Sequence, residues 1–238
     1  MTEQELLDLA RNHKRLWVQI TETGDIPPTI MVLREGKHIL TATADQMDMR
    51  YALRAAGLCR EGLNADAFLI ILDSHVREEQ YAKGVSEQEA RQDFRQRFPP
   101  GSMQQMCDEQ GACEAGILSD CLVIQYHGPD THWWVSLLYK NHGKEFEWTK
   151  VKRYGVGEFE GNIYAAMQGI LKRQRGMDIE GLKRIREALN LTEEDTYLRM
   201  GRAAVKSLCN LGYGVFLDQD CTEYTPIDCD SAEFGFPV

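Results

Sequence analysis

The sequence lacks any long run of apolar residues. The longest such run, residues 67–72, has the length of a β-strand, whereas a membrane-spanning helix needs roughly 18 to 20 consecutive apolar residues. Residues 1–5 include neither a basic nor an apolar segment, so they do not have the pattern of a signal peptide. The sequence therefore predicts a soluble protein with no membrane partner.

The cysteines also lack a recognisable framework. Seven of them are scattered along the chain, an odd number, and no two have the Cys-x2-4-Cys spacing that structural zinc prefers. This pattern is more typical of reduced cytosolic thiols than of a disulfide-stapled protein. We therefore expect a cytoplasmic location, with Cys121 in the core of a strand.

The charge is unevenly distributed. The chain has 37 acidic and 27 basic residues, which gives a net charge of −10 at pH 7. Residues 151–217 have 8 acidic and 11 basic residues, whereas residues 218–238 have six acidic residues and no basic one. An acidic main domain makes nucleic acid an unlikely partner for it, because contacts to phosphate need a cationic surface.

The first half of the chain predicts helices and strands in alternation. Thr2 and Glu5 have capping-box spacing at the start of a helix. Residues 29–43 have the pattern of a β-hairpin, and Asp45 is a plausible N-cap for a second helix. Because residues 67–72 are continuously apolar, we expect a strand buried on both faces in the middle of the sheet.

The second half predicts a meander followed by helices. Residues 77–117 are polar and are expected to form a helical insertion, and three strands are expected between residues 121 and 150. Beyond residue 160 the apolar period becomes helical. The expected fold is therefore α+β, with a mostly antiparallel sheet and flanking helices in residues 1–155, a C-terminal helical subdomain in residues 160–213 and an acidic C-terminal tail in residues 214–238.

This order of elements resembles the α-β-β-α-β-β-β plan of profilin-like and Roadblock-like domains. The resemblance covers roughly residues 2–150 and rests on element order alone. It implies a scaffold for sensing small ligands or for protein–protein contacts, although a fold does not by itself determine a function.

Histidines and an aspartate at predicted strand ends form one candidate site. Asp73 and His75 lie two residues apart, so they share a face of an extended strand. His127 and His132 flank a hairpin loop. If the four side chains converge, they supply the ligands of a divalent transition metal, such as zinc, with a position left for water. A metal-dependent hydrolase is therefore one alternative, and polar residues that merely gather at strand ends are the simpler one.

Two further surfaces could bind a partner. Basic residues recur along 160–213, among them Arg184 and Arg202, and they could meet an acidic partner, the acidic tail or nucleic acid. Trp133 and Trp134 are adjacent on one strand and must point to opposite faces, so an exposed one could anchor a contact.

No catalytic motif with a specific spacing occurs in the chain, and the glycine-rich segment 155–161 lacks the spacing of a phosphate loop. The favoured hypothesis is a non-enzymatic binding or regulatory protein that acts through protein–protein contacts. The metal-dependent hydrolase and a nucleic-acid-contacting helical module remain the alternatives.

Overall fold

The computed structural model describes most of the chain in segments. These are residues 1–21, 26–43, 49–76, 85–99, 102, 105–106, 119–142, 145–154, 162–172, 187–188 and 193–216. The glycine-rich segment 155–161, the acidic tail from residue 217 and most of the expected insertion 77–117 lie outside the described residues.

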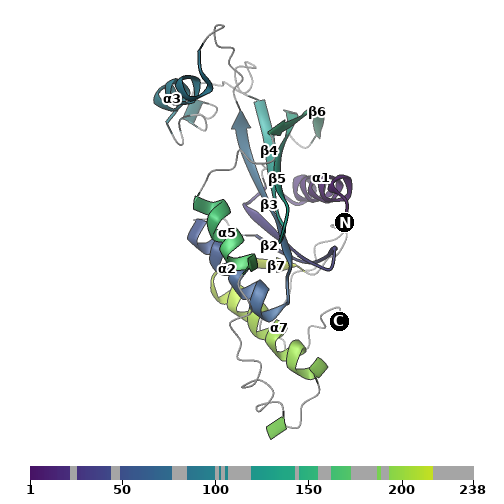
Figure 1. Ribbon diagram of the computed structural model, residues 1–238. Helices are drawn as coiled ribbons and strands as arrows, with labels where there is room; N and C mark the ends of the chain where they lie inside the picture. The colour runs from purple at the N-terminus through teal and green to yellow at the C-terminus, as the bar shows by residue number, and fades with distance from the viewer. Residues whose placement is uncertain are drawn as a thin grey trace.

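The described strands form one antiparallel sheet in the order β6-β5-β4-β3-β1-β2-β7 (Figure 1). Their bounds are β1 Thr29–Arg34, β2 Lys37–Thr43, β3 Ala67–Val76, β4 Ser119–His127, β5 His132–His142, β6 Glu145–Tyr154 and β7 Gly214–Phe216. Strand β3 contains the continuous apolar run and lies in the middle, as predicted. The hairpin β1-β2 and the meander β4-β5-β6 are also confirmed.

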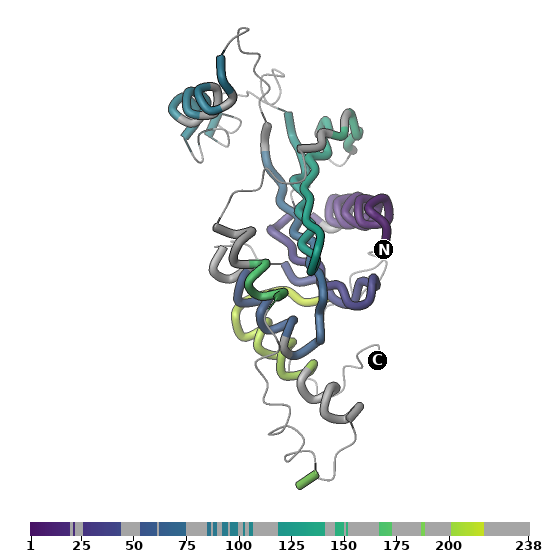
Figure 2. The backbone as a smooth tube through the Cα atoms, viewed as in Figure 1, coloured from purple at the N-terminus to yellow at the C-terminus, as the bar shows by residue number. Residues whose placement is uncertain are grey.

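The helices cover the two faces of this sheet. Their bounds are α1 Glu3–Ile20, α2 Met49–Gly62, α3 Glu87–Arg97, α5 Asn162–Lys172 and α7 Glu193–Asn210. Helix α1 lies on one face, and α2, α5 and α7 lie together on the other, whereas α3 lies beyond one end of the sheet (Figures 1 and 2). We call these two sides the α1 face and the three-helix face. An α+β fold with an antiparallel sheet is therefore confirmed.

Local sequence signals set two of the helix starts. The Thr2 hydroxyl accepts from the backbone N–H of Glu5, and the Glu5 carboxylate accepts from the backbone N–H of Thr2. Ser86 and Glu89 make the same reciprocal pair at the start of α3. Each capping box satisfies backbone donors that would otherwise lack a partner.

The described helices of segment 160–213 share a core with the sheet. One apolar cluster joins Val32 and Phe68 of the sheet with Met167 of α5 and Val205 of α7. Strand β7 then pairs with β2, with Val215 opposite Ala42. The apolar periodicity predicted the helices, but it could not show that their apolar faces pack on the same sheet.

The structure also bears on the expectations about the cysteines and about membrane-spanning helices. Cys121 is buried, as expected, and Cys59 and Cys121 are free thiols. Cys209 is disulfide-bonded, so the expectation of reduced thiols is wrong at that residue. Among the described residues, no helix is both long and apolar enough to cross a membrane.

Candidate binding groove

The two loop histidines of the predicted metal site do lie side by side. His127 of β4 and His132 of β5 are opposite partners in the strand pairing. His127 is also opposite Phe68 of β3, which belongs to the core of the three-helix face. Because paired residues share a face of the sheet, both histidines project to the three-helix face.

Asp73 is not brought together with these histidines. It pairs with Leu122, five positions along β3 from Phe68, which is about 17 Å at the spacing of a strand. An odd number of positions also puts Asp73 on the α1 face. Position 75 lies on the same face as Asp73 by register, and the His75 side chain is not among those that the structure describes. In the part of the chain that is described, no three His, Cys, Asp or Glu side chains are placed to hold a metal ion.

His127 is a buried neutral imidazole. Its side chain is 2% exposed, and burial together with neighbouring His132 lowers its pKa to about 4. Its Nε2 lies 3.4 Å from Oε1 of Gln125, on the same face of β4. A neutral ring in this position packs as part of the core at neutral pH.

The predicted binding residues lie in three different places. Trp133 stacks on Tyr126 with 5.4 Å between ring centroids on the α1 face, and Trp134 projects to the three-helix face opposite Gln125. Both tryptophans are half-buried. Arg202 is a half-buried residue of α7, and Arg184 lies outside the described residues.

Asp73 instead belongs to a buried ion pair beneath α1. Nζ of Lys14 donates to Oδ2 of Asp73 at 2.7 Å and to the Tyr139 hydroxyl at 2.9 Å. That hydroxyl donates to Oδ1 of Asp73 at 2.5 Å, and the backbone N–H of Ile26 donates to Oδ2. The side chain of Lys14 is only 1% exposed. Burial of this charge costs less than burial of an isolated ion, because each contact is a hydrogen bond from the ammonium group or a hydrogen bond from a neutral donor to the carboxylate.

A second polar contact lies next to this ion pair. The Thr29 hydroxyl donates to the carbonyl oxygen of Pro27 at 2.8 Å, so its oxygen accepts from Nε2–H of His13 at 3.0 Å. Burial is the main reason that the pKa of His13 falls to about 3, and the charges of His38 and Lys14 lower it further. The ring is therefore neutral at pH 7 and fixed in one tautomer.

Sequence reasoning missed Lys14, although a signal was present. Leu7, Ala10, Lys14 and Val18 recur at the spacing of one helical face, and all four are buried. A lysine inside an apolar stripe predicts a buried partner for its charge. Its partner Asp73 could not be chosen from the sequence, because 59 residues separate the two.

A concave feature lies on the outer side of the three-helix face. It is an open groove of about 560 Å³ between α2, α5 and the end of α7. Its lining comprises Arg54, Gly57, Leu58 and Arg60 from α2, Ile170 from α5, and Ser207, Asn210 and Leu211 from the end of α7 and the following turn.

Gly57 leaves space in the groove. It lies in the interior of α2, and a Cβ added at this position would meet no atom within 4 Å. Glycine costs roughly 0.5–1 kcal/mol relative to alanine inside a helix. Neither close packing nor a positive φ accounts for glycine here, so its structural effect is the space that it leaves in the groove.

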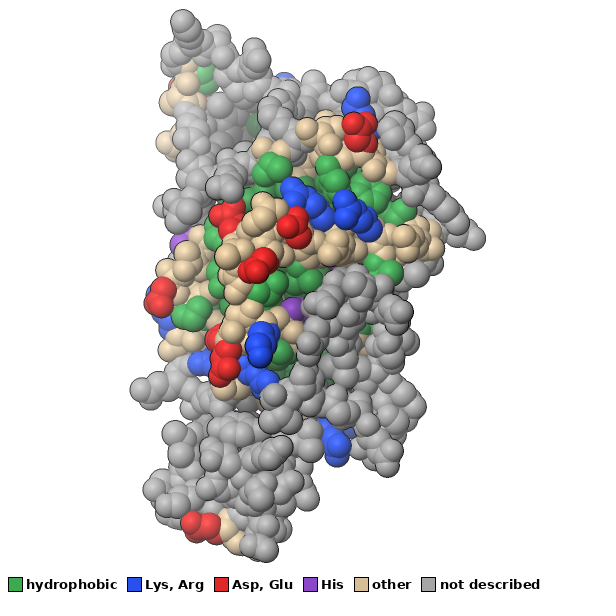
Figure 3. Space-filling view, turned by 90° about the vertical axis from the view of Figure 1, so that its right-hand side faces the viewer, with side chains coloured by type: hydrophobic (Ala, Val, Ile, Leu, Met, Phe, Trp, Pro, Cys, Tyr) green, Lys and Arg blue, Asp and Glu red, His purple; other side chains and the backbone are tan. Residues whose placement is uncertain are grey.

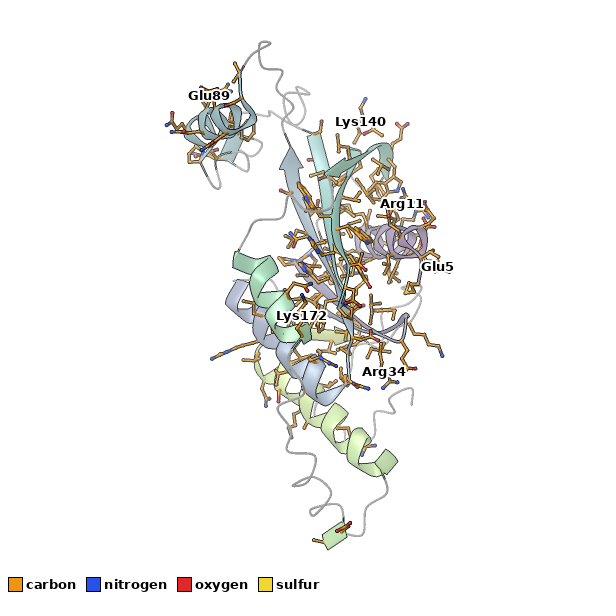
Figure 4. The ribbon with its side chains drawn as sticks, in the orientation of Figure 1. Glu5, Arg11, Arg34, Glu89, Lys140 and Lys172 are labelled. Atoms are coloured by element: carbon orange, nitrogen blue, oxygen red, sulfur yellow. The ribbon has the colours of Figure 1, made fainter. Side chains whose placement is uncertain are left out.

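The groove combines apolar and cationic side chains. Leu58 and Ile170 are half-buried, Arg54 is exposed, and the guanidinium of Arg60 is held by a hydrogen bond to the carbonyl oxygen of Ala65 at 3.1 Å. Lys172 lies at the end of α5, on the same side of the sheet (Figure 4). Helix α2 has one acidic residue, Glu61, and three arginines, helix α5 has no acidic residue, and the acidic residues of α7 are confined to its first turn.

The opposite side of the molecule has a mixed charge. Acidic and basic side chains are both present there, with hydrophobic side chains between them (Figure 3). On α1, Arg11 pairs with Asp8 at 2.7 Å. The bias towards basic residues is therefore a property of the groove side among the described residues.

Comparison with known proteins gives no relative from which to transfer a function. No protein-family model, no curated protein and no solved structure matches this chain. The resemblance of its element order to profilin-like and Roadblock-like domains therefore stays a prediction.

Proposed function

We propose that this is a binding protein that holds an acidic, amphipathic segment of a partner protein in the groove between α2, α5 and α7. The observation that carries the proposal is the groove itself, in which Gly57 leaves space beside apolar Leu58 and Ile170, with Arg54 at its rim. The proposed partner contributes apolar side chains to the floor and carboxylates to the rim.

The size of the groove favours a short segment of the partner protein, rather than a broad protein surface, as what is bound. A volume of about 560 Å³ falls within the range of sites that enclose a small number of bulky groups. A helical segment that presents apolar residues three and four positions apart places its side chains at that scale. Opposite charges at the rim would favour encounter and orientation more than they add affinity.

The alternatives from the sequence receive less support. A metal-dependent hydrolase would need Asp73 near His127 and His132, but these residues lie on opposite faces of the sheet. A nucleic-acid partner would suit the basic rim, but not the apolar floor that Leu58, Ile170 and Leu211 provide. We therefore treat nucleic acid as an outcome of the test below.

Selection from a random peptide display library with the full chain as bait tests the proposal. We expect the enriched peptides to combine Asp or Glu with Leu, Ile or Phe at helical spacing. A synthetic copy of the most enriched peptide should bind Arg54→Glu at least about tenfold more weakly than the native protein. Lys37→Glu makes the same charge change at an exposed position outside the groove, and it should bind normally.

Two results would contradict the proposal. One is a set of enriched peptides with no excess of acidic residues, or with equal affinity for Arg54→Glu. The other is salt-sensitive binding of a single-stranded or duplex oligonucleotide that Arg54→Glu abolishes, because the groove would then serve nucleic acid. Thermal unfolding of each variant separates a loss of binding from a loss of folding.

We further propose, from the sequence, that the protein acts in the cytoplasm. The free thiols of Cys59 and Cys121 support a reducing location, whereas the disulfide-bonded state of Cys209 does not. Mass measurement of thiol labelling at Cys209 in freshly lysed source cells tests the point.

A further inference from the structure

The edge of the sheet at β6 has a charge pattern that suits a second copy of itself. Strand β6 ends the sheet on one side, so one edge of its backbone is not paired with any described strand (Figure 1). Its first half contains Glu145 and Glu147, and its second half contains Lys150, Lys152 and Arg153. An antiparallel copy of the same strand would reverse this order and bring opposite charges together.

A β-bulge in β6 makes this match possible on one face. Leu138 of β5 pairs with Lys150, but its neighbour Tyr139 pairs with Trp148, so Thr149 is an extra residue in β6. In a regular strand, positions 147 and 150 would project to opposite faces. The extra residue shifts the alternation, and both positions therefore lie on the three-helix face by register.

From this arrangement we propose that two copies of the chain form a symmetric dimer by antiparallel pairing of their β6 strands. The two-fold axis passes between positions 148 and 149. Position 147 then lies opposite position 150 of the second copy, position 145 opposite 152, and position 146 opposite 151. Each glutamate position thus lies opposite a lysine position of the second copy, and each pairing occurs twice because of the symmetry.

The apolar side chains at this edge support the same register. Val151 is 44% exposed, which makes it one of three large hydrophobic residues that the described chain exposes. Phe146 is half-buried and packs edge-to-face on Trp148, with 5.0 Å between the ring centroids. By register, positions 146 and 151 both lie on the α1 face, so Phe146 of one copy would lie opposite Val151 of the other.

Alternative registers fit less well. A shift by two positions keeps Glu147 opposite a lysine, at position 152, but places Glu145 opposite Tyr154. Lysines on an exposed edge strand commonly discourage pairing with other chains. Here the glutamates of the same strand offset the charge of the lysines when the pairing strand is an antiparallel copy of β6.

Sedimentation of the full chain over a range of concentrations tests the proposal. A contact between two edge strands is small, on the order of 1,200 Å² or less, so we expect a reversible dimer that weakens at high salt. Glu147→Lys and Lys150→Glu each place like charges opposite one another and should weaken dimerisation at least about tenfold. The double variant Glu147→Lys/Lys150→Glu should restore it.

Mixing the two single variants gives an independent result. Glu147→Lys and Lys150→Glu are each expected to be monomeric, yet an equimolar mixture should form a heterodimer, because every facing pair is then of opposite charge. Lys37→Glu, outside β6, should dimerise as the native chain does. A native chain that is monomeric at all concentrations would overturn the proposal. So would a dimer that is insensitive to the single reversals, or one that neither the double variant nor the mixture restores.

Discussion

The two faces of the sheet are covered in different ways. Helix α1 lies over a face in which Lys14 is buried and paired with Asp73, and in which His13 donates to Thr29. On the three-helix face, the buried polar side chains are neutral in the described residues, and the cluster that joins the sheet to α2, α5 and α7 is apolar. The positively charged side chains of the three-helix side lie on its outer surface, at the groove.

This difference places the contacts that determine stability under α1 and the contacts that determine binding on the outer surface of the three helices. Directional contacts under α1 fix the position of one helix, and they make its attachment sensitive to substitution and to pH. Apolar packing under the three helices tolerates changes on their outer surface, where the groove lies. Substitutions under α1 should therefore change folding, and substitutions in the groove should change binding.

The largest effect is expected when the buried ion pair loses its acid. Asp73→Ala leaves the charge of Lys14 buried without its counterion, which typically costs about 3–5 kcal/mol in the free energy of unfolding. Denaturant unfolding of the native chain and the variant measures this difference. The double variant Lys14→Met/Asp73→Leu should recover a large part of the loss, because no uncompensated charge remains.

Asp8→Ala is the matched control for that loss. Asp8 also accepts from a cation, Arg11, but its side chain is 54% exposed. An exposed pair contributes about 0–1 kcal/mol, so this variant should unfold nearly as the native chain does. Equal losses for Asp73→Ala and Asp8→Ala would show that burial under α1 does not set the strength of the contact.

The next effect concerns pH and His13. Its pKa is about 3 in the folded chain and about 6.5 when unfolded, so the unfolded state binds more protons between these values. The contribution to stability is complete above about pH 6.5 and is lost as the pH falls towards 3. The loss is about 1.4 kcal/mol per pH unit through the middle of that window.

His13→Gln should flatten this dependence. Its amide can still donate to the Thr29 hydroxyl, but it does not titrate. Urea unfolding at a series of pH values between 7 and 4 compares the two chains, and the remaining slope includes His127, whose pKa is also lowered. Identical slopes for both chains would mean that His13 is not held neutral beneath α1.

Much of the fold could be predicted from local patterns. The apolar run in β3, the alternation in the meander and the capping box at Thr2 each depend on residues close in sequence. The pairing of β7 with β2 could not be predicted, because three residues are too few for a period and their partner lies far away in the chain. Likewise, the apolar period after residue 160 predicts helices but does not indicate which surface their apolar faces contact.

The candidate groove was harder to predict than the fold. Arg54, Gly57 and Ile170 meet only because α2 and α5 pack side by side, and no spacing in the sequence encodes that contact. The metal hypothesis depends on a contact of the same kind, which no spacing in the sequence encodes. Asp73 and His127 both lie at the ends of predicted strands, but the register that separates their faces comes from the pairing of β3 with β4.

The smallest effect on stability should come from two helix glycines, and it distinguishes the groove from its surroundings. A Cβ added at Gly57 of α2 or at Gly169 of α5 would meet no atom within 4 Å, but only Gly57 lines the groove. Gly57→Ala and Gly169→Ala should each raise the free energy of unfolding by about 0.5–1 kcal/mol, because alanine has less backbone freedom to lose. Gly57→Leu, which fills the space, should abolish binding of the selected acidic peptide, whereas Gly169→Leu should leave it unchanged. If both leucine variants bind alike, the space at Gly57 does not serve binding, and its glycine has no functional explanation in this structure.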